Sequence, residues 1–173
     1  MEFDLAKTLE VLERTPGVLK ELLSGISDTW AKNNEGEDTW SPYDVIGHLV
    51  HGELTDWMGR TGIILGKEDD KKFKTFDRLA QFRESEGKSL QQLLEEFESL
   101  RKKNLETLRN LNLTADDLNK TGIHPAFGEV TLKQLLSTWT VHDLSHIAQV
   151  TRVMAKQYKE ATGPWIQYLR VLQ

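Results

Sequence analysis

Two histidines spaced four residues apart are the side chains of this chain best suited to chemistry. His142 and His146 lie in the segment WTVHDLSHIAQ, whose apolar residues recur with the period of a helix. On a helix these positions project from one face, one turn apart, so both imidazoles can bind the same metal ion. Their face is apolar apart from polar groups concentrated around the two histidines, and buried imidazoles need polar partners. The pair is therefore predicted either to bind a metal or to hydrogen-bond with backbone and carboxylate groups.

A third candidate ligand, His48, lies in an earlier helix-like segment. If the fold brings it opposite the pair, three imidazoles can hold a divalent ion and leave a coordination position open for substrate. His51 competes with His48 as a ligand, because it follows closely in the same segment. Glu53 is a candidate catalytic residue that would accept a hydrogen bond from a ligand's second ring nitrogen or shuttle protons, and a surface carboxylate is the alternative interpretation.

Three further polar residues lie near these histidines in the sequence. Gln149 shares the face of the pair, and we expect it either to orient a substrate or water molecule or to pack against a neighbouring helix. Asp143 projects about 100° away from His142 on a helix, so it is not assigned as a ligand; it either holds a histidine ring or faces solvent. His124 precedes Pro125 and is predicted to belong to a structural turn.

The segment HDLSH also has the spacing of the zinc-protease helix motif, with aspartate where the proteases have a glutamate base. Aspartate is one methylene shorter than glutamate. The one acidic residue downstream that could complete a protease site is Glu160. The sequence therefore favours a site completed by His48 over a protease site.

Composition limits the class of protein. A chain of 173 residues with 38% hydrophobic and 28% charged residues can form one folded domain, which we expect to span residues 1–173. The net charge of −5, without a dense lysine and arginine block, argues against nucleic-acid binding. The absence of cysteine excludes a cysteine nucleophile, a thiolate metal site and a disulfide. No apolar run approaches the roughly 20 residues that span a bilayer, and the first residues lack a signal peptide's apolar core, so a cytoplasmic location without membrane contact is expected.

Apolar periodicity predicts an all-α protein, a four-helix bundle of up-down-down-up type with a long crossover. Ser41 with Asp44 and Thr131 with Gln134 are predicted to cap two of the helices. Pro16 is expected to kink the first helix or divide it. The charged face of the third helix is predicted to be solvated. The predicted segments are helices over 3–25, 41–66, 89–108 and 131–158, an irregular crossover at 66–87, a turn-rich stretch at 112–129 and a short C-terminal helix at 165–172.

Two motifs give the chain a family resemblance. The segment WSPxDVIGHLxxxE begins at Trp40 and contains His48, and the segment HPxxGEVTLxQLLxTWxxHDLxHIxQ runs from His124 to Gln149. In this order they resemble the DinB superfamily, and within it the YfiT-like metal-dependent hydrolases of the DinB_2 type. The resemblance implies a four-helix bundle that binds a divalent metal through His48, His142 and His146. It also implies a homodimer.

The resemblance implies less about the reaction. Relatives with a known activity transfer small thiols such as bacillithiol or mycothiol, so the expected function is a small-molecule thiol S-transferase or a hydrolase. Imidazole ligands favour zinc or nickel, with iron or manganese as alternatives. In the transferase, a low-molecular-weight thiol would be the cosubstrate. The contrasting hypothesis is a non-catalytic, metal-binding or stress-responsive bundle. Neither hypothesis gives a role to His51 or to residues 66–87.

Overall fold

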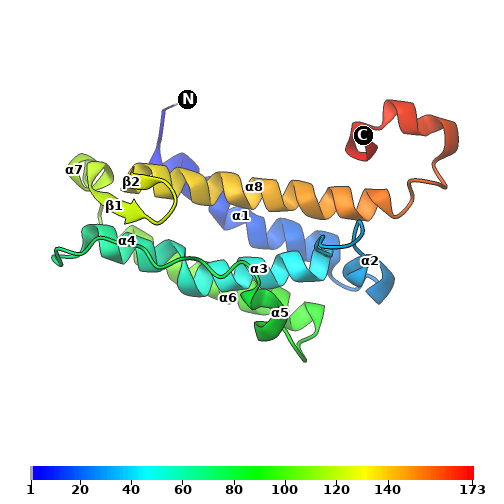
Figure 1. The fold of residues 1–173 in the computed structure, drawn as a ribbon, viewed down its shortest axis with the longest axis horizontal. Helices are drawn as coiled ribbons and strands as arrows, with labels where there is room; N and C mark the ends of the chain where they lie inside the picture. Colours follow the sequence, from blue (N-terminus) through cyan, green and yellow to red (C-terminus); the bar gives the residue numbers. More distant parts are fainter. Residues whose placement is uncertain (1) are drawn as a thin grey trace.

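Four long helical segments lie side by side along the length of the molecule, and a small hairpin lies at one end (Figure 1). The computed structural model describes residues 2–173. In chain order the elements are α1 (Leu5–Leu23), α2 (Asp28–Lys32), α3 (Pro42–Thr55), α4 (Trp57–Leu65), α5 (Ala80–Glu84), α6 (Leu90–Asn110), α7 (Ala115–Asn119), β1 (Thr121–His124), β2 (Gly128–Thr131), α8 (Leu132–Lys156) and the 3-10 helices η1 (Gly163–Tyr168) and η2 (Arg170–Leu172). The predicted helical bundle is confirmed. None of the described helices combines the length and apolar character needed to cross a bilayer.

The helices follow the predicted up-down-down-up order. α1 and α8 run in one direction along the bundle, and α3 and α6 run in the other (Figure 1). The main contacts join α1 to α6 and α8, and α3 to the same two helices. Because α3 and α6 are parallel neighbours, the chain must return along the bundle between them. Residues 66–89 make this return and are called the crossover below.

Local capping explains where the helices of the bundle begin. Ser41 accepts a hydrogen bond from the backbone of Asp44, whose carboxylate accepts one from the backbone of Ser41. Thr131 and Gln134 form the same reciprocal pair at the start of α8. Such pairs satisfy amide groups that have no partner within the helix. Both predicted capping boxes are therefore confirmed, and they set the starting points of the two helices that carry the candidate ligands.

The first end of the crossover is fastened to the hairpin. The amide of Ile123 donates to the carbonyl oxygen of Lys71 at 2.8 Å, and the amide of Phe73 donates to the carbonyl oxygen of Ile123 at 2.9 Å. The Phe73 ring lies directly over Gly122, where a Cβ atom would come within 2.5 Å of the ring. Glycine is therefore required at this position for the crossover to dock.

The second end of the crossover is fastened to α3. The Tyr43 hydroxyl donates to the carbonyl oxygen of Ser85 at 2.6 Å, and Nδ1 of His51 lies 2.7 Å from a carboxylate oxygen of Glu84. A Cβ atom on Gly47 would lie 2.3 Å from Oγ of Ser85. Gly47 thus permits α5 and its end to approach α3 closely.

Two segments differ from the sequence-based expectation. The turn-rich stretch contains an antiparallel hairpin, in which Thr121 pairs with Thr131 and His124 with Gly128. Gly128 has φ of 72°, a left-handed conformation that glycine adopts without steric cost. Strands of four residues are too short to show a clear alternating pattern. The C-terminal segment forms 3-10 helices in place of the expected short helix. Of the two alternatives for Pro16, the structure shows one continuous helix α1 and no division.

The apolar core has two parts, separated by charged residues. One part centres on Trp57, Trp139 and the start of α8, and the other on Val45, Phe97 and Val150. Between them lies a polar layer formed by Glu53, Arg101 and Asp143, whose side chains are at most 1% exposed. Burying charges is unfavourable unless they are paired and hydrogen-bonded. The pairing within this layer therefore decides whether the middle of the bundle is stable.

Arg101 of α6 forms hydrogen bonds with all three other long helices. Its guanidinium donates to the carboxylates of Glu53 on α3 and Asp143 on α8, at 2.6 to 3.1 Å. It also donates to the carbonyl oxygen of Leu12 on α1 at 2.8 Å. In a regular helix this oxygen would accept from the residue four positions later, but that residue is Pro16, which has no N–H. Arg101 supplies the hydrogen bond that Pro16 cannot.

These positions correct three expectations. Arg101 belongs to the face of α6 that was predicted to be solvated, yet it is buried. Asp143 neither holds a histidine ring nor faces solvent, because it is fully buried against Arg101. Glu53 is not a surface carboxylate: it accepts hydrogen bonds from Arg101, Asn104 and Trp139, and among the described residues it forms none with a histidine.

We predict that Arg101→Met lowers the free energy of unfolding by about 3–5 kcal/mol, because two buried carboxylates lose their counter-charge. Urea unfolding followed by circular dichroism measures this change. Arg109→Met is the matched control on the same helix, since Arg109 pairs with Glu13 at the surface and its removal should cost less than about 1 kcal/mol. Equal effects of the two substitutions would contradict the proposed importance of the polar layer.

Candidate metal centre

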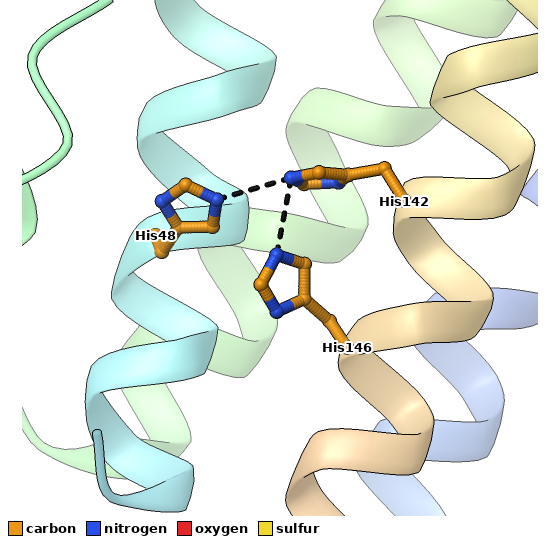
Figure 2. Close-up of side chains that lie close together, drawn as sticks. All are labelled: His48, His142 and His146. Atoms are coloured by element: carbon orange, nitrogen blue, oxygen red, sulfur yellow. Dashed lines mark hydrogen bonds between the residues drawn. The ribbon is translucent and has the colours of Figure 1, made fainter. Parts of the chain in front are cut away.

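Three imidazoles from two helices meet beside the polar layer. Figure 2 shows His48 on α3 facing His142 and His146 on α8. Nε2 of His142 lies 3.0 Å from Nε2 of His48 and 3.1 Å from Nε2 of His146. The three potential ligand atoms all lie within 4.8 Å of one another. The predicted convergence of these three residues, which form the histidine cluster, is therefore observed.

The proton positions within the histidine cluster are restricted by Gln149. Its side-chain oxygen lies 2.8 Å from Nδ1 of His146, so this nitrogen donates and Nε2 of His146 keeps its lone pair. A neutral imidazole carries a single N–H. If His142 carries it on Nε2, that one proton has to be shared between Nε2 of His48 and Nε2 of His146. A central cation would instead satisfy all three Nε2 lone pairs. The arrangement therefore fits a metal ion better than it fits hydrogen bonds alone.

Burial keeps the histidine cluster uncharged. Desolvation, together with the smaller effects of the nearby charges of His146, His51 and Arg78, lowers the pKa of His48 to about 3. Desolvation also lowers the pKa of His142 to about 2. The pKa of His146 is lowered by burial as well, while its hydrogen bond with Gln149 opposes the shift. The imidazoles are therefore neutral at pH 7, which is the form that binds metals.

Aromatic side chains surround the histidine cluster. Trp40 lies 4.8 Å from the ring of His48, and Phe76 of the crossover meets the same ring edge-on at 5.5 Å. Trp57 contacts His142 at 5.1 Å and stacks on Trp139, whose indole N–H donates to Glu53 of the polar layer. Such packing restricts the rotamers of the imidazoles. Trp40, Trp57 and Phe76 also line a cavity that lies against the histidine cluster.

The other candidate ligands lie outside the histidine cluster. Among the described residues, one group of at least three potential ligands is close enough to share an ion, and it contains neither His51 nor Glu160. Both ring nitrogens of His51 face other partners, Glu84 and Thr55. The observed geometry does not support the protease arrangement.

His124 forms the expected turn, since its Nδ1 accepts hydrogen bonds from the amides of Ala126 and Phe127.

A cavity of about 940 Å³ lies against the histidine cluster. This volume is within the range of small-molecule binding sites. Gln149 lines the cavity, whereas Glu53 does not. The walls come from α3, α4, α8, the hairpin and the crossover, and include Trp40, Phe73, Phe76, His124, Phe127 and Thr138.

Ion pairs hold part of the cavity wall in place. Glu35, in the loop before Trp40, accepts hydrogen bonds from Arg152 at 2.7 Å and pairs with Lys156 at 2.9 Å, both on α8. These interactions join the loop to α8 and so help to keep Trp40 beside His48. The hydrogen bond from Arg152, followed by that from Lys156, lowers the pKa of Glu35 to about 2 despite its partial burial.

Sequence patterns identified the histidines but missed most of their surroundings. Phe76 and Arg78 lie in a stretch that showed no regular periodicity, so their position beside the site could not be inferred. Arg101 did leave a signal: it lies four residues after Phe97 and four before Leu105, on the buried face of α6. A charged residue at such a position indicates a buried ion pair.

Comparison with known proteins agrees with the fold. The sequence matches the DinB superfamily over residues 11–150, so the chain belongs to this superfamily. The structure is similar to that of YfiT from Bacillus subtilis, described as "a probable metal-dependent hydrolase with an unusual four-helix bundle topology". The TM-score is 0.71 at 20% identity, over 88% of this chain and 86% of YfiT. The sequence has no match among curated proteins.

We predict that Glu35→Gln destabilises the protein at pH 7 by about 2 kcal/mol, because a carboxylate with a lowered pKa stabilises the folded state. The folded-state pKa of about 2 lies below the ordinary value of 4.5, so this stabilisation is complete above pH 4.5 and is lost as the pH falls toward 2. Urea unfolding of both proteins across this pH range measures the difference. Glu98→Gln, at an exposed pair with Lys20, is the control. A difference independent of pH would contradict the assignment.

Proposed function

We propose that this protein is a metal-dependent hydrolase that acts on a small molecule bound in the cavity. The observation that carries the proposal is the convergence of three neutral imidazoles beside a cavity of about 940 Å³. Membership of the DinB superfamily and the similarity to YfiT support it. The class of reaction follows from the chemistry that such a donor set allows.

In this proposal His48, His142 and His146 hold the metal through Nε2. Nitrogen ligands favour zinc or nickel, followed by iron or manganese, over calcium or magnesium. When bound at three imidazoles, a divalent ion supplies Lewis-acid chemistry, polarising a substrate oxygen and acidifying water toward a pKa of about 7. An ester or amide of a small molecule is the corresponding substrate.

The chain's own residues prepare this chemistry. The side-chain oxygen of Gln149 accepts a hydrogen bond from Nδ1–H of His146, which leaves the lone pair of Nε2 directed toward the centre of the histidine cluster. Trp40 and Phe76 cover His48 on two sides and limit the access of bulk water. The polar layer fixes the relative positions of α3 and α8, which carry the ligands. Catalysis requires such preorganisation because small displacements of reacting groups greatly reduce rates.

Thiol transfer is the second candidate function. The size of the cavity favours it, because about 940 Å³ can accommodate an electrophile together with a small thiol such as bacillithiol. The chain has no cysteine, so the thiol would have to be a cosubstrate. In this reaction the cosubstrate would attack as its thiolate, and the same three histidines would be needed.

We predict that the purified protein binds a single divalent ion per chain and that His48→Ala, His142→Ala and His146→Ala each abolish stoichiometric binding. Each substitution removes one of three ligands that the proposal assigns. Elemental analysis by mass spectrometry measures the metal content, and circular dichroism confirms that the variants are folded.

Three substitutions serve as graded controls for metal binding. His51→Ala and Glu160→Ala should retain the metal, because neither residue lies in the histidine cluster. Gln149→Leu should weaken binding by about 10–100-fold, as loss of a hydrogen bond to a ligating histidine typically does. Metal retained in His48→Ala but lost in Glu160→Ala would favour the protease arrangement. Metal-free wild-type protein that cannot be loaded would indicate a non-catalytic bundle.

We predict that the zinc- or nickel-loaded protein hydrolyses activated esters without added thiol and that His48→Ala removes this activity. Nitrophenyl esters followed by absorbance provide the measurement, with chelated protein as the control. A parallel assay supplies bacillithiol, mycothiol or cysteine together with monochlorobimane. Turnover that occurs only with added thiol would replace the hydrolase by the transferase.

The expected homodimer and cytoplasmic location stay predictions. Val141 and Leu144 are exposed on α8, at 61% and 49%, and support a helix-packing interface. Light scattering on the purified protein measures the oligomeric state.

A further inference from the structure

Three arginines line the cavity, and two of them are neutralised there. Arg60 pairs with Asp56 at 2.5 Å, and Arg152 pairs with Glu35 at 2.7 Å. Both carboxylates also line the cavity. These two guanidinium groups therefore have their hydrogen-bonding capacity largely engaged by the protein itself.

The third arginine, Arg78, has no ion pair or hydrogen bond within residues 2–173, the part of the chain that the structure describes. It lies on the crossover, two residues after Phe76, whose ring contacts His48 at 5.5 Å. Its side chain lines the same cavity as the three residues of the histidine cluster. The cavity thus contains a cationic side chain whose donors are available to a ligand.

We propose that Arg78 binds an anionic group of the substrate, so that the substrates are small molecules carrying a carboxylate or phosphate apart from the bond that is cleaved. This inference rests on the proposed metal-dependent function and names its substrate class. The guanidinium presents a planar set of donors that can bind either anion through two parallel hydrogen bonds. Arg78 is therefore a specificity-determining residue.

The aromatic lining indicates the rest of the substrate. Trp40 and Phe76 lie beside His48, and Phe127 at the tip of the hairpin is 78% exposed while stacking on His124 at 4.4 Å. All three aromatic side chains line the same cavity as Arg78. They suit an apolar or unsaturated body between the anionic group and the reactive bond.

Asp38 provides an internal comparison. It is exposed, lines the same cavity, and has no ion pair or hydrogen bond among the described residues. Its negative charge would disfavour an anionic ligand, whereas Arg78 would favour one. Neutralising the two residues one at a time should therefore change the affinity for an anion in opposite directions, while general damage to the cavity would weaken binding in both variants.

The test uses pairs of hydroxamates, which chelate the metal at one end and carry either a carboxylate or a carboxamide at the other. The chain between the two ends is varied in length, and calorimetry measures binding to the metal-loaded protein. At the best length the carboxylate should bind about tenfold more tightly than the carboxamide, as expected for a charge-assisted hydrogen bond. In Arg78→Gln this ratio should fall to about one, and in Asp38→Asn it should increase.

Two results would overturn the proposal. One is equal affinity for the carboxylate and the carboxamide at every length in the wild type. The other is an unchanged preference for the carboxylate in Arg78→Gln.

A third series of hydroxamates with a terminal phosphonate distinguishes the two anions. A larger gain in affinity over the carboxamide for the phosphonate indicates phosphate-bearing substrates. A larger gain for the carboxylate indicates carboxylic acids.

A measurement without metal separates this proposal from the proposed function. If no metal binds, neither hydroxamate binds, and the metal-dependent function is contradicted while Arg78 can still be tested. Metal-free protein is then titrated with phenylphosphonate and, as a neutral control, with benzamide. The NMR signal of the Arg78 Nε–H, assigned by its loss in Arg78→Gln, should shift with phenylphosphonate alone. No shift, or equal shifts with both compounds, would refute the role of Arg78.

Discussion

The pairing of one buried guanidinium with two buried carboxylates is the constraint on which the rest of the structure depends. Arg101 joins α6 to the other three long helices, and it does so at the level where the apolar core is interrupted. Unpaired, these charges would strongly destabilise the folded state, so the helices must adopt the relative positions that satisfy them. Because α3 and α8 also carry the histidine cluster, the same pairing that stabilises the bundle fixes the distance between the candidate ligands.

The helix order links the bundle to the cavity. Parallel neighbours such as α3 and α6 cannot be joined by a short turn, so the chain must travel the length of the bundle between them. This return passes beside His48 and places Phe76 and Arg78 at the cavity. The crossover, which the sequence left without a role, therefore forms one wall of the site. His51 contributes by holding the end of this segment through Glu84 rather than by binding a metal.

The helices, their caps and the pairing of His142 with His146 could be predicted from the sequence, because each depends on local spacing. That His48 joins this pair was implied by the family resemblance, since spacing alone does not relate residues 94 positions apart. Ser41 and Thr131 predicted helix starts from adjacent residues, and the spacing of His142 and His146 placed them on one face. The partners of Arg101 depend on three other helices, and its charge led to its assignment to the solvated face although its spacing from Phe97 and Leu105 places it on the buried one. The hairpin and the wall formed by the crossover depend on tertiary contacts, such as the fit of Phe73 over a glycine, for which a single sequence gives no pattern.

The two attachments of the crossover have a consequence for how this scaffold could diversify. Residues 74–79 lie between the contacts with the hairpin and those with α3, and most of their side chains are exposed. Substitutions there would alter the wall that faces a bound molecule while leaving the two core clusters and the buried ion pairs intact. Ligand preference and thermodynamic stability are thus encoded in separate parts of the chain, so one could evolve or be engineered without loss of the other.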